Sequence, residues 1–421
     1  MGRREVADEV IYLRAAGVDL GKRFMVACVR VPNPDRPGTW LLETAKFGTV
    51  PREARRLLAW LLEHRVEVVV LEATSDYWRF VYYTLQPQLN LLLVNPQHLK
   101  GIRGRKTDPS DAAFLARAGA SGMVLGSFVP PEHVRQLRDL TRRRSEVTVA
   151  RGQELQRLEK ELEDTGMKLT AVITQIHGVT GRAILEALIG GERDPRVLAG
   201  LAVGRARRRT EQLVDALDGR FTEHHAWMCR HLLDQVDHLD RLIAQLDARI
   251  ALLTREHDDD LALLDTIPGI GQRAAEIILA ETGGDMAQFA TAGHLASWIG
   301  VCPGVIESAG VNKSGKTRDG NGNLKRVLGI AAMSVTRVKD SYLAVFYRRT
   351  AARRGRPKAL VAVMHKLAKI IWHVLHDRVA YQDLGAQYLA RRDPQQAMRR
   401  MQRQANALGM TVRFDPLPQG V

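Results

Sequence analysis

The first part of the chain alternates between strand-like and helix-like patterns of hydrophobic positions. Leucines three and four apart after Pro51 give one apolar helix face, whereas the run before Glu72 is almost continuously apolar, as in a strand buried on both faces. Successive segments predict three strands, a helix, a strand, a helix, a strand and a helix, at residues 13–19, 24–31, 40–47, 51–64, 66–71, 76–86, 89–94 and 108–118. This order predicts a mixed α/β sheet.

The middle of the chain has the periodicity of long helices. Apolar residues recur at alternating spacings of 4 and 3 across residues 232–253, which is a heptad seam. Residues 137–162 match more weakly, because Arg144 and Arg151 interrupt the pattern. The two segments predict either an antiparallel hairpin or a dimer through the stronger seam. Residues 165–222 between them show no clear signature.

The last third is predicted to be mostly helical. It contains a turn at residues 267–271 between helical runs, a Gly-, Ser- and Asn-rich loop at 303–323, and helices near 324–350 and 358–378. The basic, polar end is expected to be disordered. We divide the chain into an α/β domain, a helical coiled-coil region with an insertion near 165–222, a mostly helical domain and a basic tail, at residues 10–125, 130–258, 259–390 and 391–421.

The surplus of positive over negative charge is confined to the last quarter of the chain. The net charge is +15, and residues 311–421 hold 22 Lys and Arg against 6 Asp and Glu, while the remainder holds 40 against 41. Such a localised surplus favours a polyanionic partner, and nucleic acid over an anionic membrane surface. The chain has no run of eighteen apolar residues and no signal-peptide core. Its three cysteines lie far apart, so we expect a reducing, cytoplasmic location without a membrane.

Acidic residues stand where predicted strands and helices begin or end. Asp19 and Glu72 each follow an apolar strand, and Asp108 and Asp111 are three apart at the start of a helix, with Asp108 as its expected N-cap. Clustered carboxylates repel one another unless a cation neutralises them. Mg²⁺ prefers such oxygen ligands, and two ions can stabilise both oxygens of a phosphoryl transfer.

These acids lie in motifs that resemble the DEDD-type transposases of insertion sequences. The motifs are Gly17-Val18-Asp19, Leu71-Glu72-Ala73-Thr74, Val94-Asn95-Pro96 and Lys106-Thr107-Asp108-Pro109-Ser110-Asp111-Ala112. The resemblance implies an RNase H-like domain similar to the RuvC resolvase, with Mg²⁺, as two ions, held by Asp19, Glu72, Asp108 and Asp111. The chain departs from the family at Ser75, where the family usually has Gly.

The resemblance continues into the last third of the chain. Residues 264–271 resemble a helix-hairpin-helix turn, in which Gly269 and Gly271 would let backbone N–H groups approach a phosphate. Further similarity covers residues 296–303, 307–310, 322–326 and 365–368. In this family a serine attacks DNA, and by motif position that serine is Ser308. Ala309 intervenes before the family's glycine, and Ser314 is the nearest competitor.

Several basic residues in this part are expected to contact nucleic-acid phosphates. The segment Arg354-Gly355-Arg356-Pro357-Lys358 resembles an AT-hook core, but its five residues between two predicted helices favour a basic loop, and either interpretation keeps phosphate contact. The other candidates, from the glycine-rich loop and the motif after it, are Lys313, Lys316, Lys325 and Arg326.

The resemblance implies a transposase that cuts and rejoins DNA with Mg²⁺ and Ser308, guided by a bridge RNA that its own element encodes. Recombination at matched sites requires a dimer or tetramer. Two alternatives remain: a metal-dependent Holliday-junction-type nuclease that uses the acids alone, and a non-catalytic nucleic-acid-binding protein.

Overall fold

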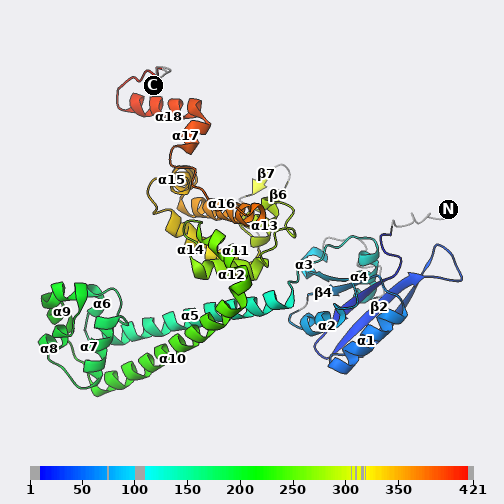
Figure 1. Ribbon diagram of the computed structural model, residues 1–421, viewed down its shortest axis with the longest axis horizontal. Helices are drawn as coiled ribbons and strands as arrows, with labels where there is room; N and C mark the ends of the chain where they lie inside the picture. Colours follow the sequence, from blue (N-terminus) through cyan, green and yellow to red (C-terminus); the bar gives the residue numbers. More distant parts are fainter. Residues whose placement is uncertain are drawn as a thin grey trace. The chain divides into compact units, whose positions relative to one another are not determined.

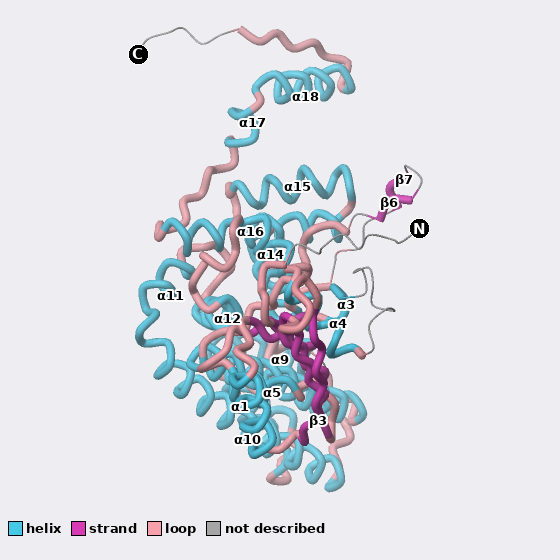
Figure 2. Tube along the Cα trace, turned by 90° about the vertical axis from the view of Figure 1, so that its right-hand side faces the viewer, coloured by secondary structure: helices cyan, strands magenta, loops and turns pink. Residues whose placement is uncertain are grey.

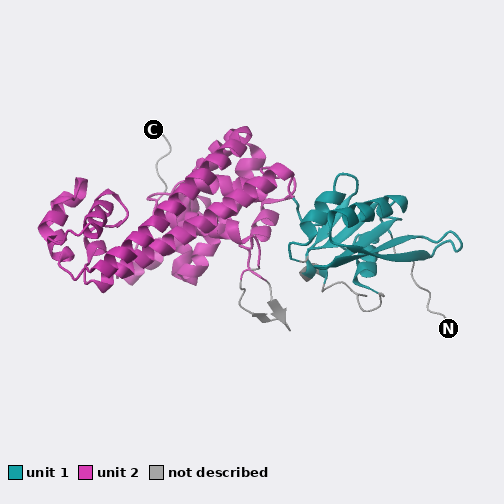
Figure 3. Cartoon of the chain, turned by 90° about the horizontal axis from the view of Figure 1, so that it is seen from below, with its two compact units in different colours: residues 1–129 teal, residues 130–421 magenta. Residues whose placement is uncertain are grey.

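The computed structural model describes residues 10–73, 75–99, 110–304, 306–308, 311–313, 317 and 319–415. The chain divides into two compact units, Met1–Val129 and Pro130–Val421 (Figure 3). Each unit has its own hydrophobic core and is described by itself.

Unit 1 is built on a five-stranded mixed sheet with the order β3-β2-β1-β4-β5. Strand β1 (Ala15–Leu20) pairs antiparallel with β2 (Phe24–Pro32), and β2 pairs antiparallel with β3 (Trp40–Gly48). On its other side β1 pairs parallel with β4 (Val68–Glu72), and β4 pairs parallel with β5 (Leu91–Val94). The mixed sheet confirms the predicted α/β class and fits an RNase H-like domain.

Helices cover both faces of this sheet (Figure 1). Helices α1 (Pro51–Glu63) and α2 (Trp78–Leu85) share one core cluster with alternate residues of the strands, including Val18 and Leu71. Helix α4 (Asp111–Ala120) packs on the opposite face, and α3 (Pro96–Leu99) follows β5. Because side chains alternate along a strand, the residues flanking Val18 and Leu71 belong to the α4 face.

Helix α4 begins later than predicted. Its first residue is Asp111, and its N-cap is Ser110, whose hydroxyl accepts a hydrogen bond from the Ala113 N–H at 3.1 Å. The expected N-cap at Asp108 is therefore wrong. The physical reason is that Asp108 and Ser110 are both residue types that cap helices, and the α4 helix begins directly after Ser110. Asp108 itself lies outside the described residues.

Unit 2 contains a long antiparallel helix pair, α5 (Glu132–Asp164) and α10 (Glu223–Thr254). Arg144 pairs with Asp247 at 2.8 Å, and Arg151 pairs with Asp240 at 2.5 Å. The hairpin alternative is thus confirmed within one chain. The two arginines that interrupt the apolar pattern of residues 137–162 form ion pairs across the hairpin.

The residues without a clear sequence signature fold into a small helical tip at the end of this hairpin (Figure 1). Leu158 and Leu162 of α5 and Leu233 of α10 belong to the core of the tip. Its helices are short: α6 (Leu169–Val172), α7 (Val179–Ile189), α8 (Pro195–Gly200), the 3₁₀ helix η1 (Gly204–Arg209) and α9 (Thr210–Leu217).

The remainder of unit 2 packs six helices around one core that also includes Leu137 of α5 and Ile250 of α10. After the 3₁₀ helix η2 (Arg255–His257) these are α11 (Asp258–Asp265), α12 (Gln272–Thr282), α13 (Ala292–Ile299), α14 (Gly322–Val335), α15 (Tyr342–Arg354) and α16 (Arg356–Asp377). The single helix expected near 324–350 is two helices, because Asp340 has a positive φ of 57° and Ser341 caps α15.

Two segments that were predicted to be a loop and a disordered tail contain regular secondary structure. The loop at 303–323 contains a short hairpin, β6 (Ile306–Ser308) and β7 (Val311–Lys313), whose strands are the only ones in the described part of unit 2 (Figure 2). The basic end forms α17 (Tyr388–Arg392) and α18 (Pro394–Ala407). The expectation of disorder is wrong for these helices, since Asp393 caps α18 by accepting from the Gln396 N–H.

Helix α16 is the one described helix that is long and apolar enough to cross a membrane by length and composition. Its apolar side chains Val363, Leu367 and Ile371 are buried in the core of unit 2. The helix packs against α11, α13, α14 and α15, as a core helix does.

Candidate active site

Asp19 and Glu72 lie side by side at the carboxyl ends of two parallel strands. The register pairs Val18 of β1 with Leu71 of β4, and each acid is the next residue along its strand. Both acids are half-buried. Since Val18 and Leu71 face α1 and α2, both acids belong to the α4 face of the sheet.

Helix α4 brings Asp111 to the same edge because Gly17 lets the helix approach β1 closely. A Cβ on Gly17 would lie 2.2 Å from the carbonyl oxygen of Ala112 and 2.5 Å from the nitrogen of Ala116. At the other end of α4, Ala120 shares a small core cluster with Ala15 and Val68, the first residues of β1 and β4. The helix therefore runs antiparallel to β1, and its first residue, the exposed Asp111, lies toward the end where Asp19 stands.

The three described acids offer the oxygen ligands that Mg²⁺ prefers. Among the described residues, however, no three His, Cys, Asp or Glu side chains are grouped so as to hold a metal ion. Asp108, the fourth predicted ligand, lies outside them. The structure thus brings Asp19 and Glu72 together on one edge, with Asp111 on the same face.

The residue at the family's glycine position is strained. Ser75 has a φ of 49°, in the left-handed region that glycine adopts without a Cβ penalty. The backbone after β4 therefore requires a conformation that the family's glycine suits, and this chain adopts it with serine.

The Gly269 turn between α11 and α12 has a packing role. Gly269 has a φ of 83°, and a Cβ there would lie 2.8 Å from the carbonyl oxygen of Ala331 on α14. Ile267 and Ile270 are buried on either side of it. Gly271 is the exposed N-cap of α12, and it has no side chain that could accept hydrogen bonds from the first N–H groups of the helix. Such N–H groups at the start of a helix are the groups to which anions bind.

Ser308 ends β6, where it pairs with Val311 of β7. An isolated bridge between Pro303 and Thr317 closes the base of this hairpin. The side chains of Ser308 and Lys313 are not described, and Ser314 and Lys316 lie outside the described residues. Just after the hairpin, the Lys325 ammonium donates to the Thr317 hydroxyl at 2.9 Å.

A buried carboxylate that the sequence analysis did not identify anchors this region. Glu281 of α12 is fully buried and accepts two hydrogen bonds from the Arg142 guanidinium, at 2.7 and 2.8 Å. The side-chain amides of Asn321 and Asn323 also donate to it, at 2.8 and 3.1 Å. Glu281 thereby ties α5, α12 and the start of α14 together. The one signal in the sequence is an acid directly after an apolar run in a predicted helix.

The electrostatics of Glu281 follow from these contacts. Burial favours the neutral carboxyl, but the hydrogen bonds from Arg142 and Asn321 outweigh burial and hold the pKa of Glu281 below its usual range. Arg138 adds a hydrogen bond to the backbone carbonyl of Glu281 at 2.7 Å. The carboxylate is therefore charged and structural at neutral pH.

The basic candidates lie at or near the ends of helices. Lys325 and Arg326 are in the first turns of α14, and Arg326 donates to the Asn323 side chain at 3.4 Å. Arg354 is the last residue of α15 and Arg356 the first of α16, with only Gly355 between them. Residues 354–358 therefore form neither the favoured basic loop nor an AT-hook core, because helix geometry extends up to both sides of Gly355. Arg354 and Lys358 instead line a pocket of about 780 Å³.

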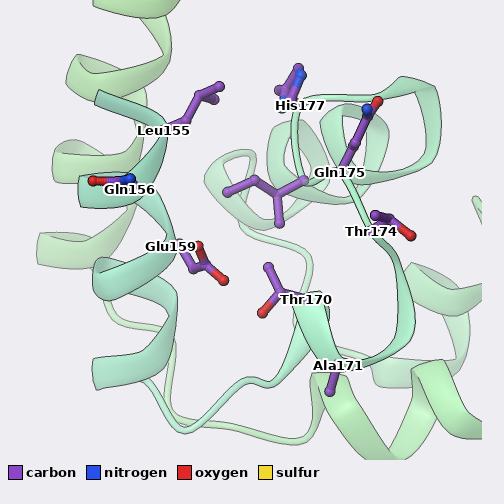
Figure 4. Close-up of a pocket in the computed structure, with 9 residues that line it drawn as sticks. Leu155, Gln156, Glu159, Thr170, Ala171, Thr174, Gln175 and His177 are labelled. Carbon is purple, nitrogen blue, oxygen red and sulfur yellow. The ribbon is translucent and has the colours of Figure 1, made fainter. Parts of the chain in front are cut away.

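A pocket of about 530 Å³ lies apart from these residues, in the helical tip. Figure 4 shows Glu159 of α5 and Thr170 of α6 facing each other across it, with His177 near its upper end. None of the predicted site residues lines this pocket. It therefore does not belong to the candidate active site.

Two family models match this chain. A DEDD transposase model of the IS110 type matches residues 16–167, which include Asp19, Glu72, Asp108 and Asp111. The model for transposases of the IS116/IS110/IS902 family matches residues 261–348, which include the Gly269 turn and Ser308.

Relatives match across both units. The pilin gene-inverting protein of Moraxella bovis is 26% identical over 374 residues, which covers 85% of this chain and 94% of the relative. The transposase for insertion sequence element IS1111A of Coxiella burnetii is 26% identical and covers 75% of this chain and 80% of its own. A 43.6 kDa protein of insertion element IS110 from Streptomyces coelicolor is 30% identical over 32% of this chain and 34% of its own.

Proposed function

Because this chain belongs to the DEDD-type transposases of insertion sequences and is a DNA recombinase, we propose that it cuts and rejoins DNA with the acids of unit 1 and a serine of unit 2. The observation that supports this proposal is the edge of the unit 1 sheet, where Asp19 and Glu72 lie near the carboxyl ends of neighbouring parallel strands on the face that α4 covers. The acids would hold divalent metal, and the nucleophile would come from the β6–β7 hairpin of unit 2 of the same or another copy.

In the proposed reaction the Ser308 hydroxyl oxygen attacks a DNA phosphorus, and the bond from phosphorus to one deoxyribose oxygen breaks. The departing oxygen takes up a proton, and the serine hydroxyl loses one. Mg²⁺, as two ions on Asp19, Glu72, Asp108 and Asp111, would supply charge stabilisation to the phosphate. Reversal of the step with another strand's hydroxyl regenerates the serine and completes strand exchange.

The partners follow from this function. DNA is the substrate, and we propose a bridge RNA encoded by the element as the guide and a dimer or tetramer as the active assembly, in the cytoplasm or nucleoid of a bacterium. Lys313, Lys316, Lys325, Arg326, Arg356 and the Gly269 and Gly271 amides are proposed phosphate contacts. Sequencing the RNA that co-purifies with the protein tests the guide. The absence of any RNA from the flanks of its own gene would contradict it.

Replacing Ser308 distinguishes a recombinase with a serine nucleophile from a junction nuclease that uses the acids alone. Ser308→Ala should abolish strand transfer, with Ser314→Ala as the matched control in the same loop. Retained strand transfer by Ser308→Ala, or its loss only in Ser314→Ala, would overturn the assignment. A nuclease that uses the acids alone predicts that Ser308→Ala still cleaves junctions.

A further inference from the structure

Two pockets adjoin each other along α15. One, of about 780 Å³, lies between α15, α16 and the bridge pair Pro303 and Thr317 at the base of the β6–β7 hairpin. The other, of about 500 Å³, lies between α15, α17 and α18. Both are lined by Phe346, Thr350 and Arg353, so they form one groove, which we name the α15 groove.

Cationic side chains line the α15 groove along its whole length, and no Asp or Glu does. They are Arg349, Arg353 and Arg354 of α15, Lys358 and Lys366 of α16, and Arg399, Arg400 and Arg403 of α18. None of them forms an ion pair with an acid among the described residues. So many like charges in one groove repel one another, and a polyanion removes that repulsion.

Arg349 shows this lack of compensation most clearly. Its Nε atom is buried without a hydrogen-bond partner among the described residues. Burial, and then the neighbouring Arg400, lower the pKa of Arg349. A buried donor without a partner is costly, so a movement of the Arg349 side chain that brings this donor to a bound phosphate oxygen would gain a charge-assisted hydrogen bond.

An aromatic ring lies where the two pockets meet. Phe346 is half-buried, and the Lys366 ammonium stands 5.6 Å from its ring centroid. Nucleic-acid-binding proteins that hold single strands combine a cationic groove for the backbone with aromatic side chains for unpaired bases. In a duplex the bases are stacked inside and cannot reach such a ring.

We propose that the α15 groove binds an unpaired stretch of a nucleic-acid strand, with its phosphates on the arginines of α15 and α18 and a base on Phe346. The groove leads from α18 to the base of the hairpin that carries Ser308. The inference rests on the proposed function only for the identity of this strand, which is the separated DNA strand or an unpaired segment of a guide RNA.

Fluorescence anisotropy with a labelled 20-nucleotide strand tests the groove in the full chain. The triple variant Arg399→Gln, Arg400→Gln, Arg403→Gln should bind the strand at least roughly tenfold more weakly. The slope of log affinity against log salt should fall by about 2, because each single-strand phosphate contact contributes about 0.7. The matched control is Arg196→Gln, Arg205→Gln, Arg208→Gln, which removes the same charge from exposed arginines of the helical tip.

Equal weakening in the control, or unchanged binding in the α18 variant, would contradict nucleic-acid binding in the α15 groove.

Phe346→Leu should weaken single-strand binding by roughly tenfold and leave duplex binding unchanged. An equal loss of duplex affinity would contradict the proposal that the groove binds an unpaired strand. If polyglutamate displaced the labelled strand as effectively as nucleic acid does, the partner would be an acidic protein instead. DNA and RNA strands of one sequence are compared, and the tighter one identifies the source. Ser308→Ala should bind normally, so a failed serine mechanism and a failed groove give different results.

Discussion

Each unit carries one part of the candidate site, and the contacts that stabilise that part inside its own unit are of opposite kinds. In unit 1, the acid-bearing strands and α4 meet through backbone and small residues, with Gly17 against Ala112 and Ala116. In unit 2, the segment that follows the serine hairpin is anchored through charge, with the buried Glu281 bonded to Arg142, Asn321 and Asn323. Close packing tolerates no added atom, whereas a buried ion pair tolerates no lost partner.

The largest expected effect comes from removing the buried carboxylate. Glu281→Ala leaves Arg142 and two amides without their acceptor and should cost about 3–5 kcal/mol of unfolding free energy. Denaturant unfolding of the full chain measures this. Glu154→Gln, which removes a helix-surface partner of Arg157 three residues away, is the control and should cost about 0.5 kcal/mol or less. Equal effects of the two would show that Glu281 does not anchor unit 2.

The same carboxylate predicts a pH dependence. Since the pKa of Glu281 is lower in the folded state than its ordinary value of 4.5, its contribution to stability is complete above that value. The contribution is lost as pH falls through the folded-state pKa. Unfolding midpoints measured from pH 7 down to pH 3 should decline more in the parent chain than in Glu281→Gln. Parallel curves would contradict this.

Adding one methyl group tests the close packing of unit 1. Gly17→Ala places a Cβ 2.2 Å from a backbone oxygen that cannot move without α4, so it should destabilise unit 1 by about 3 kcal/mol. Because α4 carries Asp111, recombination should fall as well. Gly152→Ala on α5, where nothing lies within 4 Å, is the matched control and should be neutral or stabilising. Unchanged stability of Gly17→Ala would refute the close contact.

The smallest expected effect is a gain in stability. Ser75→Gly removes a Cβ from a residue at φ 49° and should stabilise unit 1 by about 1 kcal/mol or less, with activity retained. Melting temperature is the measurement, and Ser110→Ala, which removes the α4 cap, is an opposing control. A lower melting temperature for Ser75→Gly would mean that the serine side chain makes a contact that outweighs the strain.

The comparison also explains what the sequence could predict. Strand periodicity and short motifs placed Asp19 and Glu72 at strand ends, because those signals depend on neighbouring residues. Glu281 and its partner Arg142 are 139 residues apart, so no local pattern connects them. The start of α4 at Asp111 depended on which of two capping residues meets the helix, and the fold of residues 165–222 depended on packing against the ends of α5 and α10.

The central claim is that the acids of unit 1 activate a serine carried by unit 2. Peptide mass spectrometry of DNA-linked protein tests it most directly. The account predicts a nucleotide adduct on the peptide containing Ser308, formed only with Mg²⁺ and lost in Asp19→Asn although that variant stays folded. An adduct on another residue, or full adduct formation by Asp19→Asn, would contradict it.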